Sequence, residues 1–258
     1  MKENYIKTLT LYFSLPISSR QISQWRGAFI EMAGWEDELF HNHNNEESGG
    51  RSHKSGRHNY HHRYPLIQYR VRRGKATIFA INEGVEALQQ VLANSDWKLN
   101  WQGNIETLQV EDLAMNEHYF RMLPKPKEYR LKQWLALNQE GYREWQQCDG
   151  YLQRGALLQR KLRNHLVGLF KGLQWDWPER FEVTLQNIDQ TRVIQYHDTE
   201  LMSFDITFTL NVLLPMDIAI GKGVSHGFGV VFPKTIHKRR EPHQRPSRSE
   251  MNNEKINN

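Results

Sequence analysis

The stretch of sequence that decides the fold lies near the N-terminus, where residues 5–34 read YIKTLTLYFSLPISSRQISQWRGAFIEMAG. In its first part, large apolar side chains occupy every second position, at Leu9, Leu11, Phe13 and Leu15. This period of two predicts a half-buried strand, which Pro16 ends. The serines that follow can cap a helix, and apolar side chains then recur at helical spacing, at Ile22, Trp25, Phe29 and Met32. The stretch therefore predicts a strand followed by an amphipathic helix.

The residues after position 63 continue this pattern. Residues 64–71 (YPLIQYRV) and 75–81 (KATIFAI) are strand-like and flank an Arg-Arg-Gly-Lys turn, which predicts a hairpin. A second short helix is predicted at residues 83–94, and a final strand near residues 105–121. The resulting order, β-α-β-β-α-β, is typical of the ferredoxin-like fold.

The second half of the chain repeats this order in part. Pro124 and Pro126 mark a predicted domain boundary. Beyond it we expect a strand at 129–138, a helical region at 139–173, and strands at 181–188, 203–214 and 228–233. This order resembles a ferredoxin-like unit with a reduced second helix. We therefore predict an α+β protein of two tandem ferredoxin-like (RRM-like) domains, at residues 1–123 and 124–237, followed by a disordered basic tail at 238–258.

The composition limits the class of protein. A formal net charge of +5, with 38% hydrophobic and 24% charged residues, suits a globular protein with a polar surface. No apolar run approaches the roughly 20 residues of a membrane span, so we expect a cytoplasmic protein without a membrane partner. The single cysteine, Cys148, excludes an intrachain disulfide framework and a multi-cysteine zinc site. The basic tail can touch phosphates without reading sequence.

Half of the chain's 12 histidines lie in one polar loop, at His41, His43, His53, His58, His61 and His62. The residues around His53 and His58 are rich in Gly, Ser and Asn, so we interpret these two as passengers in a mobile insertion. His41 and His43 directly follow the apolar pair Leu39-Phe40, which can anchor them. Residues two apart in an extended segment point to the same side, so His41 and His43 can face one phosphate.

A second unusual stretch lies near the C-terminus. Residues 218–233 read IAIGKGVSHGFGVVFP, with glycines at Gly221, Gly223, Gly227 and Gly229. Two interpretations stay open: a loop whose N–H groups and Lys222 bind phosphate, or a plain hairpin with glycine bulges. It is not a Walker loop, because the Gly-Lys-Ser/Thr pattern is absent and a strand follows.

The segment GKGVSHGFGVV resembles the C-terminal glycine-rich loop of the CRISPR-associated endoribonucleases that cut precursor CRISPR RNA within its repeats. YPLIQYR after a His-x-His segment, EGVEAL and YRLKQWLALNQEGY resemble further stretches of this glycine-rich-loop RAMP superfamily. The resemblance implies two ferredoxin-like domains that bind repeat RNA. It implies metal-independent cleavage through attack of the ribose 2′-hydroxyl, which leaves a 2′,3′-cyclic phosphate and a 5′-hydroxyl. No cofactor and no metal are implied.

The resemblance also implies candidate site residues. His41 and His43 match the family's His-x-His segment and are expected to transfer protons, a task suited to an unperturbed pKa of about 6.5. Which of them is the base stays open. Where relatives often carry a tyrosine two positions before Tyr-Pro, this chain has His62, so either His62 or Tyr64 is a candidate third catalytic residue, with Tyr60 a weaker one.

Basic side chains outside these loops are candidates for the RNA backbone. Arg70, Arg72, Arg73 and Lys75 form a dense group around the first predicted hairpin. Arg160 and Arg163 share one side of the predicted helical region, where a plain solvated face explains them equally well. The expected partner is CRISPR repeat RNA, precursor and mature, with other effector-complex proteins as further candidates. A monomer and a homodimer are both compatible with the sequence.

Two other hypotheses have different tests. A catalytically inactive scaffold that binds CRISPR repeat RNA would leave the RNA intact. A zinc site could in principle use His41, His43, His61 and His62, but zinc requires neither the glycine-rich loop nor the tandem fold. A metal-independent endoribonuclease is the leading hypothesis.

Overall fold

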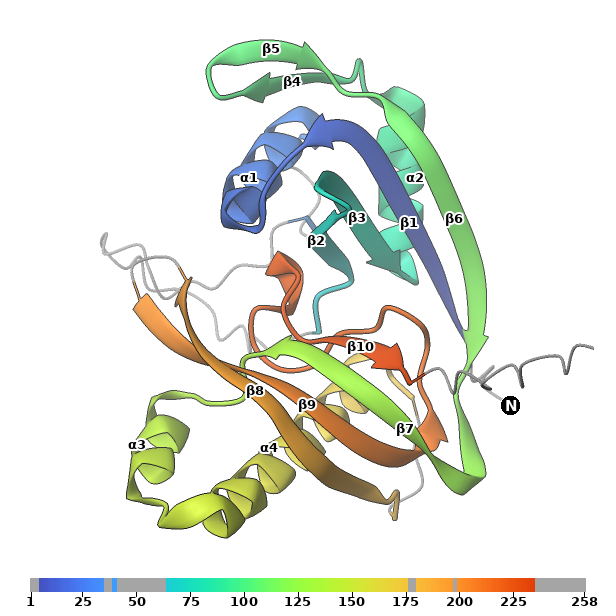
Figure 1. Ribbon diagram of the computed structural model, residues 1–258. Helices are drawn as coiled ribbons and strands as arrows, with labels where there is room; N and C mark the ends of the chain where they lie inside the picture. The colour runs from blue at the N-terminus through green and yellow to red at the C-terminus, as the bar shows by residue number, and fades with distance from the viewer. Residues whose placement is uncertain (1–4, 35–38, 41–63, 176–179, 197–198, 235–258) are drawn as a thin grey trace, which may run out of the picture.

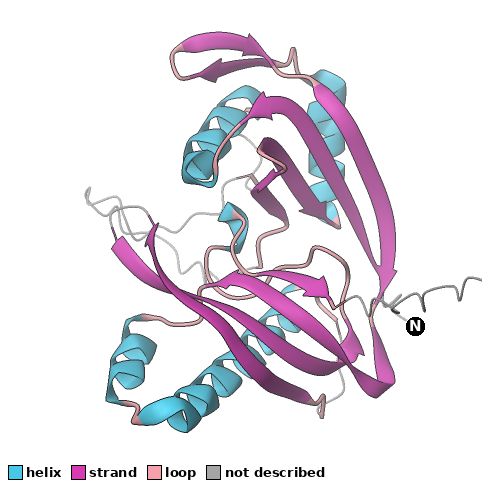
Figure 2. Cartoon of the chain, viewed as in Figure 1, coloured by secondary structure: helices cyan, strands magenta, loops and turns pink. Residues whose placement is uncertain are grey.

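The computed structural model describes residues 5–34, 39–40, 64–175, 180–196 and 199–234. Two four-stranded antiparallel sheets dominate the chain, one in each half, and each carries helices on one face (Figures 1 and 2). The predicted α+β class with tandem ferredoxin-like domains is confirmed.

The first sheet has the strand order β2-β3-β1-β6. Its elements are β1 (Tyr5–Pro16), η1 (Ser19–Gln21), α1 (Ile22–Ala33), β2 (Ile67–Arg72), β3 (Lys75–Ile81), α2 (Glu83–Asn94) and β6 (Val110–Tyr119). Every neighbouring pair is antiparallel, so the two β-α-β crossovers interleave as the ferredoxin-like fold requires. A two-stranded hairpin, β4 (Lys98–Trp101) and β5 (Asn104–Thr107), is inserted before β6 and was not predicted.

The apolar stripe that predicted the first strand faces the helices. Leu9, Leu11 and Phe13 are fully buried, and the Phe13 ring packs against Trp25 and Phe29 of α1 at centroid distances of 5.2 and 6.0 Å. Trp25 is itself fully buried, as its helical spacing indicated. Burial of these aromatic side chains supplies much of the hydrophobic stabilisation of this half.

The second sheet repeats the topology with the order β10-β7-β9-β8. Its elements are β7 (Arg121–Trp134), α3 (Gln139–Gln147), α4 (Gly150–Gly172), β8 (Val183–Tyr196), β9 (Thr199–Leu213), η2 (Val224–His226) and β10 (Val230–Pro233). The one-turn η2 stands where the second helix of a ferredoxin-like unit would be. Pro124 and Pro126 lie inside β7, where the register against β9 shifts between Met122 and Lys127. The division at residues 123 and 124 stays a prediction.

The helix-free face of the first sheet is covered by the second half of the chain. Ile6, Phe79 and Ile81 on this face belong to the same buried apolar cluster as Trp134 and Phe204 of the second sheet. Thr8, Thr10, Gln68 and Arg70 on the same face are also buried. RNA bases therefore cannot stack on the buried part of this face, whereas the edge strand β6 is exposed along most of its length. No helix in the described ranges is long and apolar enough to span a membrane.

Candidate functional site

Two isolated bridges fix the glycine-rich segment: Lys222 pairs with Leu135, which directly follows β7, and Ala219 pairs with Val230 of β10. Gly221, Gly223, Gly227 and Gly229 all have positive φ angles, of 103°, 65°, 80° and 69°. Residues with side chains rarely adopt these angles, which explains the choice of glycine. Gly223 and Gly227 stand on either side of η2. This backbone leaves the segment compact and closely packed on both of its sides.

One side of the glycine-rich loop touches the first domain. A Cβ atom placed on Gly227 would lie 3.1 Å from the Tyr69 carbonyl oxygen and 3.5 Å from the Arg70 Cα atom. The other side touches β7, because a Cβ atom on Gly221 would lie 2.6 Å from Trp134 Cδ1. The loop therefore fills the junction between the two sheets (Figure 1).

Both described ends of the histidine loop reach this junction. Phe40, which immediately precedes His41, is buried, and its ring lies 6.1 Å from Phe29, which in turn lies 6.1 Å from the Tyr69 ring. At the other end, the Tyr64 hydroxyl donates to the Ala219 carbonyl oxygen at 2.8 Å. Leu39, next to Phe40, packs against the buried apolar clusters of both halves, so the loop starts at the junction. It ends on the strand-like run that leads into the glycine-rich loop.

Tyr64 is the one catalytic candidate that falls among the described residues; His41, His43 and His62 lie outside them. Besides donating to Ala219, the Tyr64 hydroxyl accepts from Gln68 Nε2 at 3.1 Å. Burial raises the pKa of Tyr64 to about 12, against smaller opposing effects of the Gln68 bond and of Arg70. A phenol that remains protonated and bonded in this way suits an anchor of the loop.

A histidine that the sequence reasoning missed lies inside the glycine-rich loop. His226 is buried in η2, with its Nδ1 atom 3.1 Å from the Tyr196 hydroxyl and 3.2 Å from Ser225 Oγ. Its position between Gly223 and Gly227 was the signal that could have identified it. Tyr196 ends β8, so this contact ties the β8 strand to the loop.

Two residues of the basic group around the first hairpin, Arg70 and Arg72, bind to Asp217 in the second half of the chain. Arg70 is buried, donates to the Asp217 carbonyl oxygen at 2.7 Å, and stacks over the Phe79 ring at 4.3 Å. Burial lowers the pKa of Arg70 to about 10, partly offset by the Asp217 charge, so the side chain stays cationic at neutral pH. Arg72 forms an ion pair with the Asp217 carboxylate. These two arginines clamp the segment that precedes the glycine-rich loop.

The remaining cations of that hairpin differ in environment. Arg73 occupies the turn with a φ of 53° and is exposed. Lys75 forms an ion pair with Glu111 at 2.6 Å. Arg26 of α1 was not singled out from the sequence, yet its charge acts on Tyr69, whose pKa is raised by burial and lowered to a smaller extent by Arg26.

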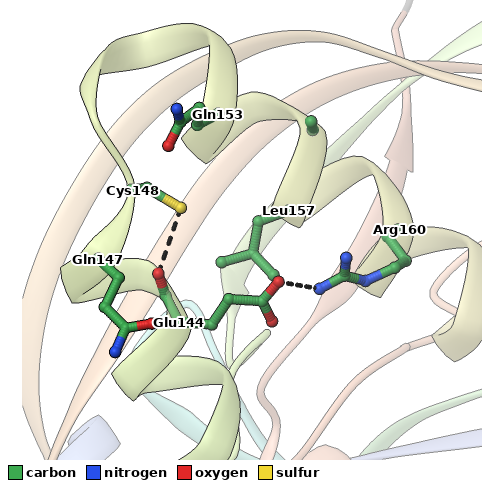
Figure 3. A pocket seen from close by; sticks show the side chains of 7 residues that line it. Glu144, Gln147, Cys148, Gln153, Leu157 and Arg160 are labelled. Carbon is green, nitrogen blue, oxygen red and sulfur yellow. Dashed lines mark hydrogen bonds and ion pairs between the residues drawn. The ribbon is translucent and has the colours of Figure 1, made fainter.

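On α4, the predicted RNA-binding arginines are engaged with protein groups. Arg160 forms an ion pair with Glu144 of α3, at the pocket that also holds Cys148 (Figure 3). Arg163 donates to the Phe181 carbonyl oxygen at 2.9 Å and stacks over that ring at 4.5 Å. Neither side chain is brought to the glycine-rich loop. The α4 side chain of His165 instead lies near the loop, because its ring bonds to Trp134, which contacts Gly221.

His165 is held as a neutral imidazole. Its Nδ1 atom accepts from Trp134 Nε1 at 3.0 Å. Burial lowers the pKa of His165 to about 4, with further lowering by the charges of Lys161 and Lys222.

The low pKa of His165 predicts acid destabilisation. The unfolded chain binds a proton on this residue below about pH 6.5, whereas the folded chain does so only near pH 4. Stability is therefore present above pH 6.5 and falls as the pH drops toward 4, with a loss from this residue of roughly 2 kcal/mol between pH 7 and 5. His165→Gln should show a shallower fall over this range in urea unfolding. An equally steep fall in the variant would contradict the assignment.

Models of a known protein family match both halves of the chain. The family model for the Cas6b N-terminal domain matches residues 4–119, and that for the Cas6b C-terminal domain matches residues 121–234. The chain belongs to the Cas6b family. The family match covers both sheets and the glycine-rich loop.

Solved structures share the same fold. A Cas6b crystal structure is 21% identical, with a TM-score of 0.73, and the match covers 89% of this chain and 99% of that one. A second, titled as a CRISPR RNA processing endoribonuclease Cas6b, is 18% identical with a TM-score of 0.65, over 89% of this chain and 99% of that one. Csf5, titled as a type IV Cas6 crRNA endonuclease, is 12% identical with a TM-score of 0.55, over 89% of this chain and 100% of that one. These likenesses show the shared Cas6 fold.

A curated relative has no described activity. The uncharacterized protein MJ0978 of Methanocaldococcus jannaschii is 29% identical over 98 residues, which is 38% of this chain. The match spans 65% of the length of that relative.

Proposed function

We propose that this chain is an endoribonuclease that processes precursor CRISPR RNA within its repeats. The observation that carries the proposal is that both described ends of the histidine loop lie at the domain junction: Leu39 packs against the buried clusters of both halves, and the Tyr64 hydroxyl bonds to Ala219. Membership of the Cas6b family, and the solved relatives titled as CRISPR RNA endonucleases, support the same substrate.

The proposed chemistry needs no metal. One of the pair His41 and His43 takes the proton of the ribose 2′-hydroxyl, whose oxygen attacks the adjacent phosphorus. The other gives a proton to the leaving 5′-oxygen, so the products are a 2′,3′-cyclic phosphate and a 5′-hydroxyl. The N–H groups of Lys222, His226, Gly227, Phe228 and Gly229 are bonded within the protein. Other backbone N–H groups of the glycine-rich loop supply hydrogen bonds to the phosphate oxygens, on which negative charge concentrates.

The other candidate residues divide between support and binding. Tyr64 anchors the loop through Ala219, which leaves His62 as the third catalytic candidate. Arg70 and Arg72 hold the junction together, while Arg73 at the hairpin turn is free to face solvent and RNA. We propose that the basic tail at 238–258, which lies outside the described residues, adds affinity without changing the cleavage position.

Chelation tests the mechanism directly. Repeat RNA incubated with the protein in excess EDTA should be cleaved at the same rate as in Mg²⁺-containing buffer of matched ionic strength. The 5′ product should carry a cyclic phosphate, seen by mass spectrometry. Complete loss of cleavage in EDTA would overturn the metal-independent mechanism. Tight binding of RNA that stays intact on long incubation, with and without metal, would instead identify an RNA-binding scaffold.

A further inference from the structure

Strand β6 is an exposed edge of the first sheet. It stands last in the strand order β2-β3-β1-β6 and runs along the outside of the first domain (Figure 1). From Asp112 to Tyr119 it pairs with β1 in an unbroken register, and no described strand pairs with its other side. An edge strand turns about half of its backbone N–H and C=O groups outward. β6 therefore offers a long row of hydrogen-bonding groups to another chain.

The other three edges of the two four-stranded sheets are protected in ways that β6 is not. β2 and β10 are short, at six and four residues. β8 is long, but its register against β9 shifts twice, between Leu185 and Asn187 and between Ile188 and Gln190. Short length and bulges both hinder the pairing of an edge with another chain, as do proline and lysine residues. The regular part of β6 has no register shift, and the strand contains no proline and no lysine.

One face of β6 carries apolar side chains that the helices do not cover. Leu113 and Met115 lie directly opposite Leu11 and Leu9 of β1, which are fully buried. Leu113 and Met115 are each 53% exposed, and Tyr119 on the same face is 60% exposed. All of β6 is described, and none of its side chains belongs to a buried apolar cluster. The apolar face of the sheet thus continues beyond the part that α1 and α2 bury.

The charges on β6 are acidic, which limits what can cover it. Glu111 forms an ion pair with Lys75 at 2.6 Å. Among the described residues, no cation forms an ion pair with Asp112 or Glu117, although Lys7 of β1 stands opposite Glu117 in the register. These carboxylates repel the phosphates of RNA and the same carboxylates of a second copy. They attract a cationic strand.

We propose that β6 binds an extended, basic segment of a partner protein, which joins the first sheet as a further strand. The backbone of the segment forms hydrogen bonds with the outward groups of β6, which supply affinity. Its apolar side chains cover Leu113, Met115 and Tyr119, and a Lys or Arg side chain lies opposite Glu117, which supplies specificity.

The partner and RNA can be bound at the same time. β2, whose Tyr69 carbonyl oxygen is in contact with the glycine-rich loop, forms the opposite edge of the first sheet from β6. A strand added to β6 therefore leaves the glycine-rich loop accessible. The inference concerns a protein partner and does not depend on cleavage.

Binding of designed peptides tests the edge. The probes are two capped ten-residue peptides, the length of β6, in which valine alternates with lysine or with glutamate. The full-length chain has a formal net charge of +5, so attraction to the protein as a whole favours the acidic peptide. We expect the basic peptide to bind about tenfold more tightly, measured by fluorescence anisotropy. Its binding should slow hydrogen exchange within residues 110–119, because outward N–H groups become bonded.

Two double variants separate the charges from the apolar cover. Asp112→Asn with Glu117→Gln should lower the affinity for the basic peptide about threefold to tenfold. Leu113→Ser with Met115→Ser should lower it about tenfold. Val193→Ser is the matched control, because it removes a similarly exposed apolar side chain from β8, an edge strand of the second sheet. This control should leave the affinity unchanged, and melting temperatures close to that of wild type confirm that each variant folds.

Several outcomes would overturn the proposal. These are equal affinity for the two peptides, unchanged exchange in residues 110–119, and failure of the basic peptide to bind at about 1 mM. Self-association that the double serine variant abolishes would assign β6 to a second copy instead. Protection of residues 110–119 by a repeat RNA with a 2′-deoxy nucleotide at the cleavage position would assign it to RNA. Faster exchange there on removal of residues 238–258 would assign it to the basic tail.

Discussion

His41→Ala and His43→Ala are each expected to slow cleavage of repeat RNA by at least about 100-fold, with a change in affinity of less than about threefold. A positioned acid or base contributes about 100-fold to 10,000-fold to a proton-transfer step, and this contribution disappears with the imidazole. The affinity depends mainly on phosphate contacts elsewhere, so it is nearly unchanged. Single-turnover rates at saturating protein measure the first quantity, and binding to the 2′-deoxy RNA measures the second.

His53→Ala is the matched control, because it removes an imidazole from the same loop without touching the His-x-His pair. Its rate should remain within twofold of wild type. The pH dependence then assigns the roles. Wild type should show a bell-shaped rate profile, and loss of the base should flatten the acidic limb, while loss of the acid should flatten the alkaline limb. Wild-type rates in both the His41 and the His43 variants would place the catalytic pair elsewhere, with His226 at the junction as the next candidate.

The fold was largely predictable because each sheet buries a continuous face. That burial places apolar side chains at every second position of β1. By contrast, β3 is buried on both faces, and it was predicted from its apolar run and the turn before it. The β4–β5 hairpin escaped prediction because β5 is exposed along its whole length, with Ile105 70% exposed, so no alternation marks it. The C-terminal part of β8 is also little buried. For this reason the predicted strand at 181–188 ended well before Tyr196, where β8 ends.

The site was predictable only where a residue's role follows from its chain neighbours. Phe40 was expected to anchor the loop, and it is buried. The contacts of Arg70 and Arg72 were not predictable, because Asp217, which holds both, lies 145 positions from Arg72 along the chain. On α4, Arg160 was predicted to contact RNA, but it forms an ion pair with Glu144. The sequence could not reveal this pair, because it depends on how α3 packs. The sequence shows which residues carry a positive charge, whereas the partner of each depends on the tertiary structure.

Gly229→Ala is expected to destabilise the folded protein by about 2–5 kcal/mol. The Gly229 φ angle of 69° costs an alanine about 1–2 kcal/mol. A Cβ atom there would also overlap the Ile220 carbonyl oxygen, a backbone atom that cannot move aside as a side chain can. Forced overlap in a well-packed site costs a further 1–3 kcal/mol. Urea unfolding monitored by tryptophan fluorescence measures the loss.

Gly150→Ala provides the matched control in the same half of the chain. Gly150 has a similar φ of 80° but open space around its Cβ position, so only the backbone cost of about 1–2 kcal/mol should appear. Equal losses in the two variants would show that Gly229 is required for its backbone angle alone. A larger loss at Gly229 would show that the loop's close approach to Ile220 matters. The Ile220 N–H holds the two segments together by donating to the Gly229 carbonyl oxygen at 2.8 Å. An alanine at position 229 should therefore also displace the neighbouring Gly221 and Lys222. RNA binding by the protein that remains folded should then be weaker.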